Sequence, residues 1–500
     1  MKKEKYLINP NLEEARHLSE GYGRIPVSLV LKNIKKEPSE VFLILKAQSK
    51  RCYILESLED KGARGRYTIL GYDPTLGIDC LNGHLVIRGD TDIQIDTINP
   101  EVYIKKIMSE NKSPKIEGCP PFVGGLVGYF SYDYIKYAEP TLALDALDEE
   151  NFKDFDLMLF DKVITFDHKT NEITLTISIK AKDLSENYYK AVSELANMHR
   201  LIDNGIQAKV KPLKLKSQFE RLFNKQEYCQ MVIKAKEHIF EGDIFQIVLS
   251  NRISAEAEGS LFDTYLELRK SNPSPYMFYF SSDDIEIAGA SPETLVKVTH
   301  KKAFTYPLAG TRPRGRTDEE DLKLEVELLN DQKELAEHNM LVDLGRNDIG
   351  KICEFGTIKV DKHLAIERFS HVMHIGSVVS GTIKDNLEGI DAIEAVLPAG
   401  TLSGAPKIRA CEIINKLENN KRGIYGGAIG YLSFSGDTDT CIAIRIAFKK
   451  NNKVFVRSGA GIVADSIPEK EYEECENKAK AVLNALRQSQ TSRGQNDFIN

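Results

Sequence analysis

The sequence predicts an α+β fold in which antiparallel β-sheets pack as a sandwich with flanking helices. Three observations favour it: short apolar runs follow one another across tight turns, segments with helical spacing are gathered separately, and strands do not alternate with helices as they do in βαβ units. Of the 500 residues, 42% are hydrophobic and 28% are charged, a composition typical of a globular protein with a large core.

The first 200 residues are predicted to be mainly β-strand. The predicted strands there are Val41–Leu45, Cys52–Glu56, Leu85–Ile87, Val163–Phe166 and Ile173–Ile179, and the predicted helix is Ser185–His199. From Asn204 to Lys225 the composition turns polar and rich in lysine, which is typical of a domain boundary. We therefore expect an N-terminal part over residues 1–215 and a second domain over residues 220–490.

The second part combines strands with long helices. The predicted helices are Gln226–Glu241, Leu322–Leu344 and Glu469–Arg487. The predicted strands are Asp243–Ser250, Met277–Phe280, Ile285–Ala288, Gly426–Ser433, Thr440–Phe448 and Val454–Val463. The second and third of these strands form a predicted hairpin, and no repeat of fixed period is visible in the sequence.

Charge and cysteine usage exclude several classes of protein. The formal net charge is -7, so no overall basic field would attract nucleic acid or an anionic membrane. Residues 1–17 lack the apolar core of a secretory signal, and no stretch reaches the apolar length of a transmembrane helix. The 8 cysteines are scattered singly, which argues against zinc fingers, iron–sulfur clusters and a disulfide framework. We expect a cytoplasmic protein.

Two predicted helices each carry a Glu-x-x-Glu step. Glu334 and Glu337 lie on one helix, and Glu471 and Glu474 lie on the other. Residues three apart share a helix face, so each step directs two carboxylates the same way. If the helices meet, the carboxylates are suited to a hard cation such as Mg²⁺, which takes only one or two protein carboxylates. The alternative is a solvated acidic face, which is common on surface helices.

A glycine-rich segment continues the last predicted strand. Gly459 and Gly461 let backbone N–H groups approach an anion closely. With Ala464 they fit the spacing of a dinucleotide fingerprint, but that motif requires a helix to begin at once inside a βαβ unit, whereas here apolar residues continue the strand. Residues 400–407 likewise lack the G-K-[ST] ending of a phosphate-binding loop, so we reject nucleotide binding.

One arginine lies inside an apolar predicted strand. Alternation over Thr440–Phe448 places Cys441 and Arg445 on the same face. An arginine there needs a polar cavity or an anionic partner, and an internal salt bridge is the alternative. His371 and His374 are either proton carriers or satisfied core histidines. Together with the carboxylates and glycines, these residues indicate a Mg²⁺-dependent enzyme for a small dianion.

Dispersed motifs of the second part resemble those of the chorismate-utilising enzymes. They are Pro275–Tyr279, Gly289–Glu293, Pro307–Gly315, Glu337–Asp348, Gly400–Lys407, Tyr425–Gly427 and Gly459–Val463, in colinear order between about Lys225 and Gln488. The resemblance implies the chorismate-binding fold for the second domain.

Ala309 indicates a branch of this family. The isochorismate, salicylate and aminodeoxychorismate synthases typically carry lysine here, as base or nucleophile, whereas similar sequences with alanine are anthranilate synthases. The resemblance therefore implies conversion of chorismate and ammonia to anthranilate and pyruvate, the first step of tryptophan biosynthesis. It also implies an N-terminal tryptophan site for feedback inhibition, lined by Ser57, Pro275, Tyr276 and Met277. The family usually has Leu at the position of Ile54, which is a mild departure.

The resemblance assigns roles to the candidate site residues. It implies that Mg²⁺ is bound by Glu337 and Glu474, with Glu334 and Glu471 as possible helpers through bound water. The residues implied in chorismate binding are Gly310, Thr311, Tyr425, Arg445, Gly459, Ala460 and Gly461. The residues implied in catalysis are Glu293 as general acid, His374 in the elimination of pyruvate, and Thr401 near the ring.

The implied reaction needs neutral ammonia, because ammonium is not a nucleophile. No cysteine of this chain lies in the Gly-Cys-x-Gly-x-Gln turn that the relevant glutamine amidotransferases use. We therefore expect a separate amidotransferase subunit, in a heterotetramer of two large and two small subunits. The alternatives are an aminodeoxychorismate synthase and a non-catalytic regulator that binds chorismate or tryptophan.

Overall fold

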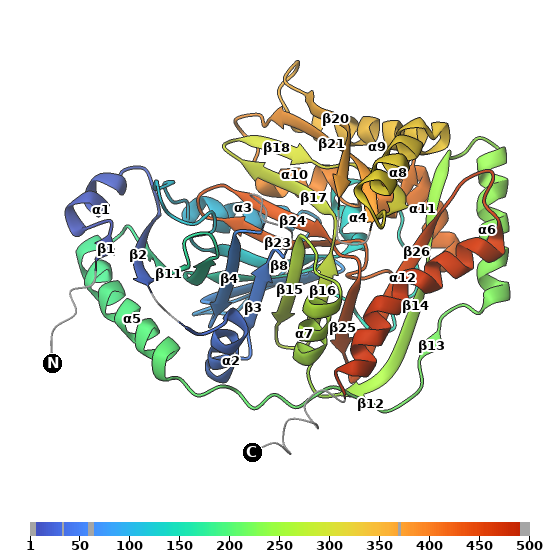
Figure 1. The fold of residues 1–500 in the computed structure, drawn as a ribbon. Helices are drawn as coiled ribbons and strands as arrows, with labels where there is room; N and C mark the ends of the chain where they lie inside the picture. The colour runs from blue at the N-terminus through green and yellow to red at the C-terminus, as the bar shows by residue number, and fades with distance from the viewer. Residues whose placement is uncertain (1–6, 33–34, 59–64, 369–371, 491–500) are drawn as a thin grey trace.

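Two large antiparallel β-sheets form the centre of the molecule, as the computed structural model in Figure 1 shows. The structure describes residues 7–32, 35–58, 65–368 and 372–490. The sheets enclose a core whose residues come from both: Tyr53, Phe278, Phe280 and Phe448 from one, and Val127, Tyr129, Met158 and Ile429 from the other. The prediction of an antiparallel α+β sandwich with flanking helices is therefore confirmed.

The strand orders show how the chain builds these sheets. The 14-stranded sheet runs β1 (Ile8–Asn9), β2 (Arg24–Lys32), β11 (Glu172–Lys180), β10 (Lys162–Asp167), β4 (Tyr67–Tyr72), β3 (Cys52–Glu56), β15 (Tyr276–Ser281), β16 (Glu286–Ser291), β25 (Ile446–Lys450), β26 (Lys453–Ile462), β14 (Gln246–Glu258) and β12 (Lys214–Leu215), with β13 (Glu220–Arg221) and β22 (Gly404–Ala405) also on β14. The 12-stranded sheet runs β19 (Leu308–Pro313), β21 (Val372–Thr382), β18 (Lys302–Thr305), β17 (Thr294–Thr299), β24 (Thr438–Ile442), β23 (Ala428–Ser433), β8 (Gly125–Phe130), β9 (Phe155–Phe160), β5 (Leu76–Leu81), β6 (His84–Arg88) and β7 (Ile93–Asp96), with β20 (Lys359–Arg368) on β21.

The two halves of the chain repeat one order of elements. The first runs β2, α2 (Pro38–Gln48), β3, β4, β5, β6, α3 (Glu101–Glu110), β8, β9, β10, β11 and α5 (Leu184–Asn204), with β7 inserted after β6 and the short helix α4 (Ile135–Ala138) inserted after β8. The second runs β14, α7 (Phe262–Ser271), β15, β16, β17, β18, α10 (Gly389–Val396), β23, β24, β25, β26 and α12 (Pro468–Gln488), with further elements inserted after β18 and after α10. Residues 1–215 and 220–490 share both sheets, because β3 pairs with β15 and β8 pairs with β23.

Helices cover the sheets where the second half carries its site. The helix α12 packs on β26 and also contacts α7 and α6 (Lys225–Phe240), so the three lie together in Figure 1. The inserted helices α8 (Asp318–Asn330) and α9 (Gln332–Gly350) pack on β19 and β21, and α11 (Lys407–Glu418) packs on β14. In the described part of the chain, no helix has the length and apolar character needed to cross a membrane.

The predicted strand Val41–Leu45 is wrong, because these residues lie in α2. An unbroken apolar run does not distinguish a buried strand from a buried helix, and all five residues are buried here. Glu37 and Glu40 form a capping box, and Pro38 occupies the first turn, where its missing N–H costs nothing. These start signals outweigh the strand preference of the run.

The predicted helix Leu322–Leu344 is two helices. Asp331 separates α8 from α9, and its side chain accepts the backbone N–H groups of Lys333 and Glu334. It is therefore the N-cap of a new helix rather than an interior residue of one long helix. The predicted strand Thr440–Phe448 is likewise two strands, β24 and β25, which lie in different sheets.

Phe280 in β15 tests the packing of one sheet on the other, because its ring meets that of Tyr129 in β8 edge to face, with centroids 6.4 Å apart. We expect Phe280→Ala to lower the free energy of unfolding by about 3–5 kcal/mol through the cavity it leaves. Urea denaturation of the purified chain measures this change. Phe240→Ala, at a side chain that is 74% exposed, is the matched control and should leave stability nearly unchanged. Equal stability of both variants would contradict the packing.

Candidate active site

Two crossings between the sheets bring the predicted acid and the predicted arginine together. The chain passes from β16 to β17 through Glu293, and from β24 to β25 through Arg445. The N–H of Ile442 donates to the carbonyl of Glu293 at 3.0 Å, and the N–H of Ala290 donates to that of Arg445 at 3.2 Å. Arg445 has a φ of 51°, so it belongs to neither strand, and the prediction that it alternates with Cys441 on one strand face is wrong.

A cavity of about 640 Å³ lies at these crossings. The predicted residues that line it are Glu293, Gly310, Thr311, Glu334, Glu337, His374, Thr401, Tyr425, Arg445, Gly459, Gly461, Glu471 and Glu474. Ala460 differs, because its side chain is fully buried in an apolar cluster that includes residues of α6 and α11. The sequence therefore identified residues of one cavity, although they are spread over most of the second half of the chain.

The Glu293 carboxyl is placed to hold a proton. Thr401 lies in the short 3-10 turn Gly400–Leu402 and donates its hydroxyl proton to Oε1 of Glu293 at 2.9 Å. Burial raises the pKa of Glu293 to about 7, while the Thr401 hydrogen bond and the charges of Lys478 and Arg445 act in the opposite direction. A carboxyl with this pKa exists in both forms near neutral pH, as a general acid requires.

The pairing of β19 with β21 shifts register between Ala309 and Arg312, and His374 of β21 lies beside Gly310 in this irregular stretch. Its Nδ1 lies 2.8 Å from the carbonyl oxygen of Gly310 and 3.1 Å from the hydroxyl of Thr311. A carbonyl only accepts, so Nδ1 carries the proton and the neutral ring has its lone pair at Nε2. Burial lowers the pKa of His374, which favours this neutral form. The other histidine named from the sequence, His371, lies outside the described residues.

The four glutamates of α9 and α12 line the same cavity from opposite helices. Burial raises the pKa of Glu337, and the charges of Glu334 and Glu474 raise it further. Burial also raises the pKa of Glu471, again with a contribution from Glu474. This mutual repulsion is what a bound cation would relieve, so the donor set fits Mg²⁺. Within the described ranges, no three of these carboxylates come within 4.8 Å of one another.

Arg445 lines the same cavity. The Arg445 side chain is exposed, and its exposed surface faces the cavity. Burial by the surrounding residues nevertheless lowers its pKa. Among the described residues Arg445 forms no ion pair, so the salt-bridge alternative does not hold. Tyr425 is 3% exposed, and its hydroxyl would be only 3.1 Å from a Cβ at Gly459. A side chain in place of that glycine would crowd the Tyr425 hydroxyl and the Leu249 carbonyl.

Lys478 and Gln246 are two of the cavity residues that were missed in the sequence. Lys478 bonds Oε1 of Glu474 at 2.6 Å and donates to the carbonyl of Gly459 at 3.2 Å, and its position four residues after Glu474 was the available signal. Gln246 is 6% exposed, and its Oε1 has no hydrogen-bond partner within the described structure. The sequence feature that could have identified Gln246 is a polar side chain at the start of an apolar strand.

Comparison with known proteins gives this cavity a context. Residues 50–484 match the family described as chorismate binding enzyme. The chain belongs to this family. Anthranilate synthase component 1 of Acetivibrio thermocellus is 43% identical over 493 residues, which cover 97% of this chain and 99% of the relative.

Two solved structures extend the comparison. Anthranilate synthase component I from Streptococcus pneumoniae is 38% identical, with a TM-score of 0.72 over 85% of this chain and 94% of that chain. The menaquinone-specific isochorismate synthase from Escherichia coli is 18% identical, with a TM-score of 0.66 over 95% of this chain and 98% of that chain, and it shares the fold.

This chorismate binding enzyme has a second cavity, of about 770 Å³, between its two sheets. Ser57, Pro275, Tyr276 and Met277 all line it, so the residues predicted for an inhibitor lie together. The Tyr276 hydroxyl donates to Oδ1 of Asp439 at 2.7 Å. The Ser57 hydroxyl is buried and has no hydrogen-bond partner within the described structure, so it is available to a ligand.

The Thr401 hydrogen bond should be visible in the titration of Glu293. The bond favours the ionised carboxylate, so we expect Thr401→Val to move the pKa of Glu293 upward from about 7. Infrared spectra of the protonated carboxyl band, recorded across neutral pH, measure this shift, and Glu293→Gln identifies the band. A pKa that stays in place or falls in Thr401→Val would contradict the assigned bond.

Proposed function

We propose that this chain is the large, chorismate-converting subunit of an anthranilate synthase, which makes anthranilate, pyruvate and water from chorismate and ammonia. The proposal is supported by the residues that line one cavity: a protonatable carboxyl, a neutral histidine, four glutamates from two helices, and an arginine that forms no ion pair among the described residues. A ring that bears two carboxylates and must lose a hydroxyl, a proton and a pyruvyl ether needs each of these groups.

Binding would use both ends of the cavity. Glu337 and Glu474 would hold Mg²⁺, with Glu334 and Glu471 acting through bound water, and the ion supplies Lewis acidity at the ring carboxylate. At the other end, the planar Arg445 fork is suited to the enolpyruvyl carboxylate. The backbone amides of residues 459–461 and the Tyr425 hydroxyl complete that end. Gly310 and Thr311 would flank the substrate from β19.

The proton steps follow from the same geometry. Protonated Glu293 would donate to the departing C4 hydroxyl, which leaves as water while ammonia attacks C2. His374 would then accept the C2 proton at Nε2 as pyruvate is eliminated and the ring becomes aromatic. Ala309 is 8% exposed and lines the cavity beside Gly310, so this position offers no amine that could serve as base or nucleophile. Such an amine is not needed in the proposed reaction, because ammonia itself is the nucleophile.

Ammonia would come from a glutamine amidotransferase subunit, in a heterotetramer of two large and two small subunits. The relatives' name, component 1, is consistent with a second component. No described cysteine is set up as a nucleophile: burial raises the pKa of Cys52 to about 12 and that of Cys353 to about 11, for example. The unpartnered Oε1 of Gln246 would accept an N–H of ammonia inside the cavity.

The second cavity would bind L-tryptophan as feedback inhibitor. Its wall is largely apolar and aromatic, which suits an indole ring, and the Ser57 hydroxyl could meet a polar group of the amino acid. An enzyme with this regulation belongs to tryptophan biosynthesis and would work in the cytoplasm.

The proposal is tested by product analysis. We expect the purified chain, with chorismate, Mg²⁺ and an ammonium salt, to form anthranilate, and tryptophan to inhibit it. Divided by the concentration of neutral ammonia, the rate should fall as pH rises through about 7, because Glu293 must be protonated. A 4-amino product would show an aminodeoxychorismate synthase instead, and absence of turnover with intact chorismate or tryptophan binding would show a regulator.

The variant Glu474→Gln tests the proposed metal site independently of the proposed regulatory site. We expect the Mg²⁺ concentration needed for half-maximal rate to rise by about 100-fold or more, because a charged ligand is lost. Tryptophan binding should be unchanged, and since the chain has 0 tryptophan residues, the indole fluorescence of the ligand reports it directly. Glu473→Gln is the matched control, since this neighbour pairs with Lys225 outside the cavity. An unaltered Mg²⁺ requirement in Glu474→Gln would remove this residue from the site.

A further inference from the structure

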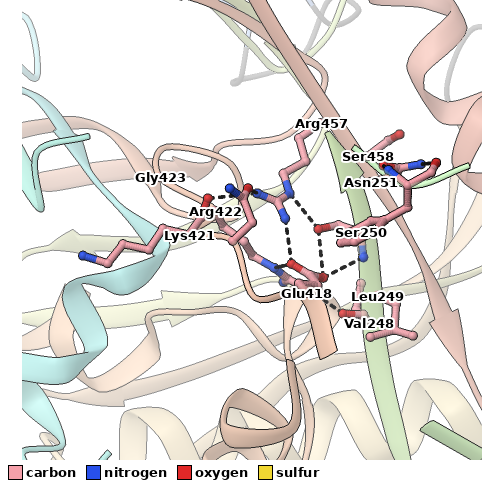
Figure 2. A network of polar contacts seen from close by, with 12 residues as sticks. Val248, Leu249, Ser250, Asn251, Glu418, Lys421, Arg422, Gly423, Arg457 and Ser458 are labelled. Carbon is pink, nitrogen blue, oxygen red and sulfur yellow. Dashed lines mark hydrogen bonds and ion pairs between the residues drawn. The ribbon is translucent and has the colours of Figure 1, made fainter. Parts of the chain in front are cut away.

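A buried ion network adjoins the cavity, which one of its members, Arg457, also lines. Figure 2 shows the network, and none of its members was among the candidate residues. The Glu418 carboxylate at the end of α11 is shared by two arginines: Arg422 approaches it at 2.5 Å and Arg457 of β26 approaches it at 2.8 Å. All three side chains are 1% exposed. The N–H and the hydroxyl of Ser250 in β14 also donate to Oε1 of Glu418, at 2.7 and 3.0 Å.

Arg422 reaches further than the carboxylate it neutralises. Its Nη1 donates to the carbonyl of Leu402 at 2.5 Å, and its Nη2 donates to the carbonyl of Val248 at 2.7 Å. The guanidinium also lies 4.6 Å from the ring centroid of Tyr132 and 6.0 Å from that of Tyr425. One planar cation therefore connects β14, the 400–402 turn and the segment that carries Tyr425.

The hydrogen bond from Arg422 to the Leu402 carbonyl connects the network to the proposed general acid, Glu293. Leu402 follows Thr401 in the same turn, and the Thr401 hydroxyl holds Oε1 of Glu293 at 2.9 Å. We propose that Arg422 is a positioning residue: by holding the Leu402 carbonyl it fixes Thr401 against Glu293, and by its ring contact it fixes Tyr425 at the anion end of the cavity. The inference rests on the proposed function, because it takes Glu293 as the general acid.

The chemistry of the network explains why an arginine is needed. Arg422 makes bonds in two directions at once, to Glu418 and to two backbone carbonyls, which the fork of a guanidinium allows and a lysine ammonium does not. A buried cation persists only where its charge is compensated, so Glu418 keeps Arg422 both charged and oriented. Arg457 restrains the other carboxylate oxygen, Oε2, and donates from Nε to the hydroxyl of Ser250 at 2.8 Å.

The test is Arg422→Lys, compared with Arg24→Lys as a matched control. Arg24 is also a buried arginine, and it bonds the Ser178 carbonyl at 2.5 Å and lies 3.6 Å from Asp161, but in the N-terminal half of the chain. Both variants keep the positive charge and should lower thermal stability. We expect only Arg422→Lys to raise the pH at which Glu293 titrates, because only there is the Thr401 bond loosened, and to lower kcat by about tenfold to a hundredfold.

A double-mutant cycle identifies the route. If Arg422 acts through Thr401, the upward titration shift of Arg422→Lys and that of Thr401→Val should not add in the double variant. If Arg422→Lys does not fold, Glu418→Gln, which keeps the side-chain volume and loosens the ion pair, should shift the titration in the same direction. An unchanged titration in the folded variant, additive shifts, or an equal shift in Arg24→Lys would overturn the inference.

The infrared titration of Glu293 needs no substrate, which separates this inference from the proposed function. A wild-type chain that makes a product other than anthranilate, while Arg422→Lys still moves the Glu293 titration, would refute the function and leave the positioning role standing. A wild-type chain that makes anthranilate, with no shift in Arg422→Lys, would do the reverse.

Discussion

The site depends on a backbone constraint: two crossings between the sheets are hydrogen-bonded to each other. Ile442 and Ala290 donate to the carbonyls of Glu293 and Arg445, and the Ser291 hydroxyl donates to the carbonyl of Ile442 at 2.7 Å. Residues at a crossing are released from the pleat alternation that would direct them to one face of a sheet. Glu293 and Arg445 can therefore both face the cavity while rigid strands on either side hold their Cα atoms, which is the preorganisation that catalysis requires.

The first half of the chain contains the same pair of crossings, beside two smaller cavities of about 460 and 370 Å³. The chain passes from β4 to β5 at Asp73 and from β9 to β10 at Asp161. There the charged side chains satisfy one another, with Lys162 bonding Asp73 at 2.8 Å and Arg24 lying 3.6 Å from Asp161. Arg445 has no ion pair among the described residues, so its charge remains available to a ligand. The repeated scaffold positions charges in both halves, and in the first half those charges are paired with one another.

Local signals in the sequence predicted local structure well. The strand Cys52–Glu56 has the predicted bounds, and the predicted hairpin is the β15–β16 pair. The failures occur where tertiary context decides. The run Val41–Leu45 fits a buried helix as well as a strand. Arg445 lies at a crossing between the two sheets, which the periodicity of the sequence does not reveal. The repeat of elements was invisible, because it lies in strand order rather than in residue identity.

The same distinction holds for the site. Spacing placed two glutamates on each helix, but whether the helices meet is a tertiary fact, and here both line one cavity. Arg422 stands four residues after Glu418, but its other partners, the carbonyls of Leu402 and Val248, lie 20 and 174 residues away in the chain and could not be predicted. Residues that contact a ligand can leave motifs in a sequence, whereas residues that hold them in place are recognised only when the folded neighbours are known.

Two consecutive residues of the β16–β17 crossing line different cavities. Glu293 lines the first cavity, and the next residue, Thr294, lines the second and shares a 3.0 Å hydrogen bond with the Tyr276 hydroxyl. A ligand affects a distant site only through a difference in its contacts between two states of the protein. Here any ligand that displaces Tyr276 must either break its bond to Thr294 or move the residue that follows Glu293. The crossing that holds the acid is thus also the shortest route by which occupancy of the second cavity can reach the chemistry.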